Sequence, residues 1–194
     1  MNKPLKIGIT GGIGSGKTYV AQIFMKMGVP IYFADDRAKW LMNNNVTIIK
    51  KVHQLFGPNA YNNDSLNRAY IANKIFKNKF LLEKLNSIVH PAISIDFNLW
   101  LDSQKTPYVI KEAALLIESG SYIDLDAILT IDAPLGVRIK RAAYRDKQSK
   151  KEIEKRITNQ LANSTKVKVA DFVINNDGYT PLLPQVIQLN TLWN

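Results

Sequence analysis

The sequence predicts an α/β fold with helices on both sides of a parallel sheet, and three observations lead to this prediction. Short apolar runs of strand character recur along the chain, at residues 5–10, 29–33, 108–112, 127–132 and 172–175. Segments with helical spacing of apolar residues separate most of these runs, as in β–α–β units. The first run leads directly into a glycine-rich turn, so the following helix should begin at the carboxyl edge of the sheet.

The glycine-rich turn at residues 11–18 reads Gly-Gly-Ile-Gly-Ser-Gly-Lys-Thr and fits the pattern G-x-x-x-x-G-K-[ST] at every defined position. Glycines let backbone N–H groups turn toward a phosphate, and the N-terminus of the next helix adds its positive dipole end. We expect Lys17 to reach the β- and γ-phosphates and the Thr18 hydroxyl to bind Mg²⁺. The predicted ATP-binding residues of this segment are Gly12, Ile13, Gly14, Ser15, Gly16, Lys17, Thr18 and Tyr19.

Length and composition narrow the class of protein. The 194 residues, 46% apolar and 22% charged, are typical of one globular domain with a full core. The uncharged apolar runs are shorter than the roughly 20 residues that a membrane span needs. The absence of cysteine excludes disulfides and thiolate metal sites and favours a cytoplasmic location. A monomer is favoured, although the sequence does not fix the oligomeric state.

The net charge of +10 is compatible with nucleic acid, an acidic membrane surface or a phosphorylated small molecule as partner. The basic residues are dispersed and no nucleic-acid-binding motif accompanies them, so we expect neither nucleic acid nor a membrane as partner. The densest basic block, residues 147–156, is interpreted either as a solvated helix face or as a set of phosphate contacts.

A long helical region separates the early strands from the later ones. It is interrupted at Gly57-Pro58 and at the turn-rich residues 61–65, without a strand signal of comparable strength. A closing helix begins near Pro181. The predicted parts of this single kinase-like domain are a core of residues 1–40, 106–135 and 168–194, a helical subdomain of residues 41–105 and a lid of residues 136–167.

Carboxylates follow two of the predicted strands. Asp35 comes after the strand at 29–33 and precedes a helix expected from about Arg37. Because parallel strands end at one edge, Asp35 should lie near the loop, where a carboxylate can take the proton of an acceptor hydroxyl. Asp35 can equally cap the next helix, and Asp36 has the same two interpretations with less support for chemistry. Glu112 either supports Mg²⁺ through water or forms a strand-end salt bridge.

Arginines three and four residues apart mark the predicted lid. Arg138, Arg141 and Arg145 share one helix face, and Lys140 and Arg156 belong to the same basic stretch. The planar guanidinium matches phosphate oxygens, and a lid that carries several of them can close over ATP and exclude water. A basic outer helix face is the alternative for any single member.

Three further residues have weaker indications of function. His90-Pro91 is expected to follow one helical run and open another. His90 is either a substrate contact or an ordinary hydrogen-bonded residue, and His53 has no motif around it. Glu118 is expected only to cap or pair locally. No histidine and carboxylate cluster has the spacing of a structural zinc site.

Beyond the loop, the chain resembles the dephospho-CoA kinases over nearly its whole length. The resemblance rests on an ordered set of residues, namely 9–18, 34–35, 66–68, 89–93, 115–118, Arg141, 145–146, Arg156, Gln160 and 170–178. It implies a three-layer P-loop NTPase fold with a helical subdomain for the CoA moiety and a lid over ATP. It also implies ATP with Mg²⁺ and phosphorylation of the 3′-hydroxyl of the ribose of dephospho-CoA, to give CoA.

The resemblance implies residue roles as well. Asp35 becomes the base or acceptor-orienting residue, Lys17 and Arg141 stabilise the γ-phosphate, and Arg68 and His90 contact the substrate. Residues 175–178 would lie near the adenine. The ATP-binding set thereby gains Arg145 and Asn175.

The chain departs from the family pattern at three positions. Phe33 stands where members often carry an aspartate, which concentrates the role of base on Asp35. Ala114 replaces a usual proline, and Tyr19 replaces a small hydroxyl residue after the loop.

Two other functions are alternatives to dephospho-CoA phosphorylation. One is that of another small-molecule P-loop kinase, for instance one acting on a nucleoside monophosphate, and the other is that of a nucleic-acid-stimulated ATPase.

Overall fold

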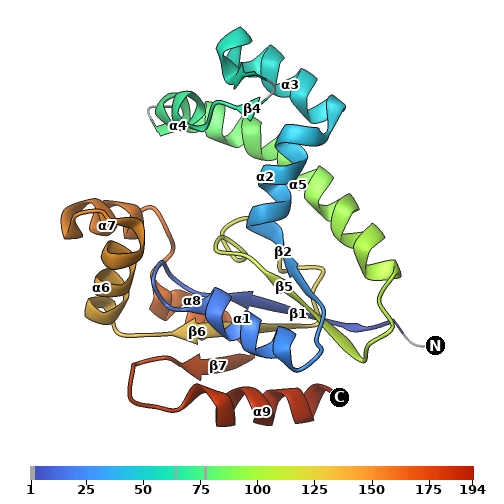
Figure 1. Ribbon diagram of the computed structural model, residues 1–194, viewed down its shortest axis with the longest axis vertical. Coiled ribbons are helices and arrows are strands. Elements are labelled where there is room, and N and C mark those ends of the chain that lie inside the picture. Colours follow the sequence, from blue (N-terminus) through green and yellow to red (C-terminus); the bar gives the residue numbers. More distant parts are fainter. Residues whose placement is uncertain (1–2, 64, 77) are drawn as a thin grey trace. The chain divides into compact units, whose positions relative to one another are not determined.

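The chain of this computed structural model, which describes residues 3–63, 65–76 and 78–194, divides into two compact units (Figure 1). The core unit comprises Met1–Phe33 and Gln104–Asn194, and the helical unit comprises Ala34–Ser103. The chain therefore leaves the core directly after its second strand and returns before the third strand of the sheet.

The core unit is built on a five-stranded sheet in the order β2-β5-β1-β6-β7, with every neighbouring pair parallel. The parallel sheet predicted from the apolar runs is thus confirmed, with a second strand shorter than expected. The strands are β1 (Leu5–Thr10), β2 (Ile31–Phe33), β5 (Tyr108–Glu112), β6 (Ala127–Asp132) and β7 (Phe172–Asn175).

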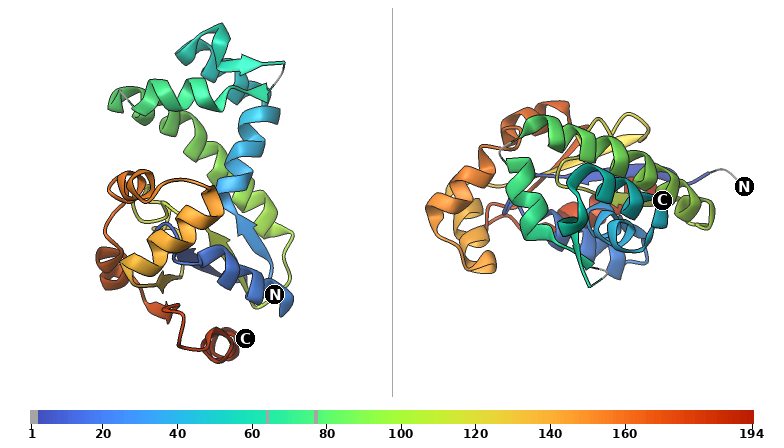
Figure 2. Two further views of the ribbon diagram at one scale, coloured as in Figure 1. Left: turned by 60° about the vertical axis from the view of Figure 1, so that its left-hand side comes forward. Right: turned by 90° about the horizontal axis from the view of Figure 1, so that it is seen from above.

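Five helices in the described residues of the core unit accompany the sheet. Helix α1 packs on the sheet and against α9, α8 contacts β6, and α6 and α7 lie side by side (Figures 1 and 2). The closing helix predicted near Pro181 is α9. The helices of the core unit are α1 (Lys17–Lys26), α6 (Leu135–Asp146), α7 (Lys150–Ile157), α8 (Asn163–Val169) and α9 (Leu182–Trp193).

The apolar core of this unit is closed by α9. The Trp193 ring stacks on Phe24 of α1 at 5.9 Å and meets the edges of Tyr108 and Phe172 at 5.4 and 5.3 Å. The Tyr108 hydroxyl donates to Asn190 Oδ1 at 2.5 Å, and burial raises the pKa of this phenol. The aromatic cluster therefore joins α1, two strands and α9, and it fixes the helix that begins at the phosphate loop.

Helices α6 and α7 form a helical hairpin with its own apolar contacts. Ile139 and Ile153 are buried together, and Ile13 of the loop packs against them. Lys147 ends α6 in the left-handed region at φ 52°, and Ser149 begins α7 with a capping box to Glu152. Local signals therefore define the turn between the two helices. Ile13 joins the apolar cluster of the hairpin to the phosphate loop.

The helical unit has a separate apolar core. Leu41, Ile48, Val52, Ile71 and Leu85 are buried in it. Its elements are α2 (Ala34–Asn44), α3 (Val46–Phe56), η1 (Pro58–Ala60), β3 (Tyr61–Asn62), β4 (Ser65–Leu66), α4 (Arg68–Phe76) and α5 (Lys79–Asp102). No helix in residues 3–63, 65–76 and 78–194 combines the length and apolar character needed to cross a membrane.

The helical unit differs from the sequence expectation in three places. Helix α2 begins at Ala34 and not near Arg37, because two aspartates suit the positive end of its first turn. A short antiparallel pair, β3 with β4, occupies the segment expected to be only a turn. Helix α5 runs through Pro91, because buried residues on both sides of it, from Leu85 to Leu101, keep one continuous packed stripe.

Truncating Trp193 tests the role of the aromatic cluster. The Trp193→Ala variant should lose about 3–5 kcal/mol of unfolding free energy, since the cavity adjoins α1, two strands and α9. Urea unfolding followed by circular dichroism measures this loss. The neighbouring Leu192 is 64% exposed, so Leu192→Ala should change stability by less than about 0.5 kcal/mol. Equal losses for the two variants would contradict the assignment.

Candidate active site

The phosphate loop runs from the end of β1 at Thr10 to the start of α1 at Lys17. Gly14 and Gly16 adopt φ angles of 78° and 92°, in the left-handed region that favours glycine. A side chain on Gly14 would strike the backbone of Arg138, and one on Gly16 would strike the amide of Asn176. These glycines are therefore required both by conformation and by the close approach of α6 and of the segment after β7.

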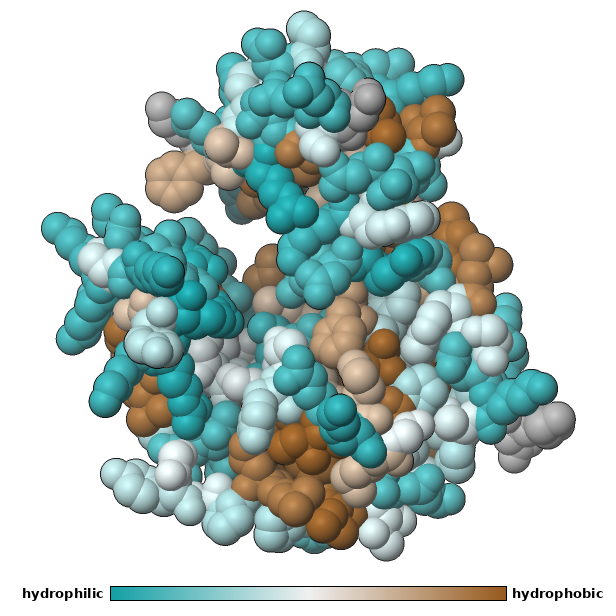
Figure 3. Space-filling model, in the orientation of Figure 1, coloured by the Kyte–Doolittle hydropathy of each residue, from teal (hydrophilic) through white to brown (hydrophobic). Residues whose placement is uncertain are grey.

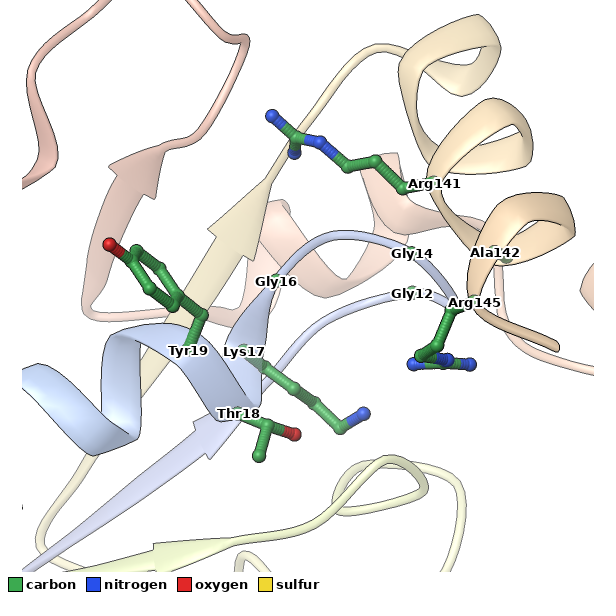
Figure 4. A pocket seen from close by; sticks show the side chains of 9 residues that line it. All are labelled: Gly12, Gly14, Gly16, Lys17, Thr18, Tyr19, Arg141, Ala142 and Arg145. Carbon is green, nitrogen blue, oxygen red and sulfur yellow. The ribbon is translucent and has the colours of Figure 1, made fainter.

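A cavity of about 240 Å³ lies against this loop (Figure 4). Arg141 and Arg145 extend from α6 on opposite sides of the loop in this view, and Lys17 and Thr18 point to the side of Arg145. The structure thus brings residues of the predicted loop and of the predicted lid into one pocket. The lining consists of Gly12, Gly14, Gly16, Lys17, Thr18, Tyr19, Arg141, Ala142 and Arg145.

Glu112 links the first residues of α1 to the sheet. Its Oε1 accepts a hydrogen bond from the Thr18 hydroxyl at 3.2 Å and lies 3.6 Å from Lys17 Nζ. The Glu112 side chain is only 5% exposed. The ion pair expected as one alternative is therefore present. The other alternative, support of Mg²⁺ through water, stays a prediction, and Glu112 lies beside the hydroxyl expected to bind that cation.

The Thr18 and Glu112 oxygens suit a hard cation. Mg²⁺ takes one or two protein oxygens together with phosphate and water oxygens, so a dense carboxylate cage is not required. In the part of the chain that the structure describes, no group of three or more His, Cys, Asp or Glu is arranged to hold a metal. The donor set beside the loop thus matches a metal that arrives with a nucleotide.

Arg141 is held to the loop through Asn176. Its Nη1 donates to the Asn176 carbonyl at 2.9 Å and its Nη2 to Asn176 Oδ1 at 3.3 Å. The Asn176 amide in turn donates to the Ser15 carbonyl at 2.7 Å and is buried. Arg141 is therefore oriented in the pocket by the same residue that supports the loop backbone.

Arg145 belongs to a charged cluster with Asp146 and Arg156. Arg145 Nε lies 2.7 Å from Asp146 Oδ1, and Arg156 Nη1 lies 2.5 Å from Asp146 Oδ2. Hydrogen bonds from Arg145, and then from Arg156, lower the pKa of Asp146 to about 2. The carboxylate thus stays ionised at neutral pH and holds an arginine of α6 to one of α7.

Arg138 has a different position from the other two arginines of its helix face. It is 5% exposed, and its Nε donates to the Ile13 carbonyl at 3.1 Å. Burial lowers the pKa of this guanidinium, and the nearby Asp132 opposes that effect. The predicted three-arginine face is therefore divided, with Arg141 and Arg145 lining the pocket and Arg138 supporting the loop.

Three predicted ATP-binding residues lie outside the pocket lining. The Ile13 side chain packs with Ile139 and Ile153. The Ser15 hydroxyl is buried and has no hydrogen-bond partner among the described residues. The Asn175 N–H donates to Gln185 Oε1 at 2.9 Å, which joins β7 to α9. None of these three residues lines the cavity.

The helical unit contains the other three predicted site residues. Asp35 is exposed in the first turn of α2, and Asp36 beside it pairs with Lys39 at 2.6 Å. Arg68 is the first residue of α4, and His90 lies within α5. Both of these side chains are exposed.

The basic block at residues 147–156 lies mainly on the surface. Its lysines are exposed, and the visible face of the α6–α7 hairpin is mostly hydrophilic (Figure 3). Arg156 differs from the lysines because it binds Asp146. The solvated-face interpretation is therefore favoured for the lysines.

Sequence reasoning gave no role to Gln160 or Asn163 and placed Asn176 only within a segment near the adenine, yet all three residues contact the loop. Gln160 and Asn163 each accept a hydrogen bond from a loop N–H, and Asn176 donates to a loop carbonyl. Two of them fell within segments that resembled the family, but a lone amide residue carries no spacing signal. Their partners lie about 150 residues away along the chain.

Comparison with known proteins identifies the family. The family profile described as dephospho-CoA kinase matches residues 5–181. A dephospho-CoA kinase of Bacteroides fragilis (strain YCH46) is 38% identical over 186 residues, covering 95% of this chain and 91% of the relative. The chain belongs to the dephospho-CoA kinase family. A member from Porphyromonas gingivalis is 36% identical and covers 95% of the chain and 92% of the relative.

Solved structures place the kinase in the same fold. A protein of Thermus thermophilus superposes with a TM-score of 0.87 at 30% identity and covers 98% of this chain and 96% of that chain. The dephospho-CoA kinase from Campylobacter jejuni gives 0.69 at 24% identity, covering 96% and 95%. A shikimate kinase from Acinetobacter baumannii gives 0.54 at 13% identity, covering 97% and 92%. The predicted α/β P-loop fold is confirmed.

The pKa of Asp146 predicts a pH-dependent contribution to stability. Because the folded pKa of about 2 lies below the unfolded value, the carboxylate stabilises the fold fully above about pH 5. This contribution is lost as the pH falls through 4 toward 2. The stability gap between the native kinase and Asp146→Asn, measured by urea unfolding, should therefore be constant from pH 7 to 5 and shrink at pH 3.5.

Glu83 provides the control for this measurement. It lies on the surface of α5 with one lysine at 3.9 Å, so Glu83→Gln should change stability little at every pH. A gap for Asp146→Asn that widens as the pH falls would contradict the assignment.

Proposed function

We propose that this kinase transfers the γ-phosphoryl group of ATP to the 3′-hydroxyl of the ribose of dephospho-CoA, giving CoA and ADP. One observation supports the ATP-binding part of this proposal. Lys17, Arg141 and Arg145 line one pocket at the N-terminus of α1. The choice of dephospho-CoA as acceptor rests on membership of the family.

Cationic groups at this pocket suit phosphoryl transfer, which needs positioning and charge neutralisation more than covalent help. Lys17 would bind the β- and γ-phosphates, and Arg141 would stabilise the charge of the transferred group. Arg145 would contact the nucleotide from the α6–α7 hairpin, which we propose as the lid. Closure of the lid would exclude water and so favour transfer over hydrolysis.

Thr18 and Glu112 would hold Mg²⁺, Thr18 directly and Glu112 directly or through water. The bound cation supplies neutralisation of the β- and γ-phosphate oxygens. Lys17 pairs with the same carboxylate, and this pair would hold its amino group near the phosphates. The fit of this donor set supports the proposal of Mg²⁺ as cofactor.

Asp35 is proposed as the base on the acceptor side. Phe33 is in register with Glu112 at the end of the sheet, and Asp35 follows two residues later. The bond from the 3′-oxygen to the γ-phosphorus would form as the bond to the β,γ-bridging oxygen breaks. The hydroxyl proton would pass to the Asp35 carboxylate, and Arg68 and His90 would contact the substrate.

The remaining parts of the proposal follow from the sequence. We propose a cytoplasmic monomer that acts on a small molecule and uses neither nucleic acid nor a membrane as partner. The exposed lysines of the α6–α7 hairpin then serve solubility and not a nucleic-acid interface.

An acceptor panel tests the function. With ATP and Mg²⁺, dephospho-CoA should give CoA by mass spectrometry, whereas nucleoside monophosphates and sugars should give no product. Lys17→Ala should lower the rate by about 100-fold or more, because the phosphates lose a positioned cation. Phosphorylation of a nucleotide alone would support the other small-molecule kinase, and RNA-stimulated ATP hydrolysis would support the ATPase.

The two adjacent aspartates of α2 provide a matched test of the base. Asp35→Asn should lower kcat by about 100-fold or more and change the KM for ATP little, since the proton acceptor is lost but the donor site is intact. Asp36→Asn should keep near-normal turnover, because its side chain is 72% exposed and pairs with Lys39. Normal turnover in Asp35→Asn would contradict the assignment.

A further inference from the structure

Two amide side chains hold the backbone of the phosphate loop. Gln160 lies between α7 and α8, and Asn163 is the first residue of α8. The Gly12 N–H donates to Asn163 Oδ1 at 2.8 Å, and the Ile13 N–H donates to Gln160 Oε1 at 3.0 Å. Gly12 is buried. Two successive peptide groups of the loop are therefore satisfied by side chains and not by solvent.

Asp132 fixes the direction of the Asn163 amide. Asn163 Nδ2 donates to the Asp132 carboxylate, at the end of β6, and Asn163 is 8% exposed. An amide has a donor side and an acceptor side. Because a carboxylate only accepts when ionised, it binds the donor side and leaves the acceptor side for Gly12.

The segment that carries the two amides is anchored to the body of the core unit. The Leu161 N–H donates to Glu118 Oε1 at 3.1 Å. Lys166 is fully buried, with its Nζ 2.7 Å from Glu118 Oε1 and 2.8 Å from the Ala114 carbonyl. Breaking such a buried pair is costly, so these contacts fix the segment to the core unit.

We propose that Gln160 and Asn163, with Asp132 behind Asn163, are positioning residues for phosphoryl transfer, which we call the loop clasp. They orient the peptide groups of Gly12 and Ile13 and so hold the loop in its phosphate-binding form before ATP arrives. A preorganised loop loses less conformational freedom on binding, so the clasp raises affinity for the phosphates. This inference rests on the proposed role of the loop in binding ATP.

Asn163→Asp tests the clasp through charge. It places a second carboxylate against Asp132 at nearly unchanged volume, so the Kd for ADP with Mg²⁺, measured by calorimetry, should rise about tenfold at pH 8. The KM for ATP should rise in parallel and the KM for dephospho-CoA should not change. A purely structural lesion would not follow this profile.

The reciprocal exchange tests the direction of the hydrogen bonds. Combining Asn163→Asp with Asp132→Asn restores one donor facing one acceptor and keeps an acceptor for Gly12. The double variant should regain ADP affinity to within about threefold of the native kinase. A double variant that folds and binds no better than Asn163→Asp would overturn the proposal.

Gln160 gives an independent test that does not depend on the Asp132 pair. Gln160→Met removes the acceptor for the Ile13 N–H and should weaken ADP binding several-fold, whereas Gln54→Met, at an exposed position of α3, should leave ADP affinity unchanged. Normal ADP affinity in both Gln160→Met and Asn163→Asp would overturn the clasp. ADP affinity is measured without an acceptor. The result therefore does not depend on whether dephospho-CoA is the substrate.

Discussion

The central position of β1 is the constraint on which the pocket depends. Its backbone pairs with β5 on one side and β6 on the other, with Ile9 in register with Glu112. The phosphate loop therefore begins between the ends of two strands, and each strand contributes a carboxylate to it. Glu112 reaches Thr18, and Asp132 reaches the loop through Asn163. A shift of one residue in either pairing would turn these side chains to the opposite face of the sheet.

Each cationic group of the pocket has a partner within the protein. Lys17 pairs with Glu112, Arg141 bonds to Asn176 and Arg145 bonds to Asp146. These contacts limit the rotamer freedom that the long side chains would otherwise lose on binding phosphate. In the proposed ATP complex, phosphate oxygens would replace these partners on the same donors. The affinity for ATP would then reflect the exchange of one set of charge-assisted hydrogen bonds for another.

Sequence reasoning predicted the sheet and the phosphate loop because their signals are local. A run of apolar residues followed by glycines at set positions needs no distant partner to be recognised. It placed the start of α2 too late, although the two aspartates of its first turn are a local signal. It also predicted only a turn where β3 pairs with β4 and divided α5 at Pro91, because tertiary packing outweighs local preference at these two places. Gln160 and Asn163 received no role for the same reason. Their function arises only when the fold brings them to Gly12 and Ile13.

The contact between the loop and α6 limits how this protein can diverge. The Arg138 backbone occupies the space where a side chain on Gly14 would lie, and the Arg138 guanidinium lies where one on Gly12 would lie. A methyl group at Gly14 would displace the start of α6, and a displaced helix would carry Arg141 and Arg145 with it, whereas a methyl group at Gly12 would displace the Arg138 guanidinium. The loop and α6 therefore cannot drift independently in evolution, even though more than 120 residues separate Ile13 from Arg138 along the chain.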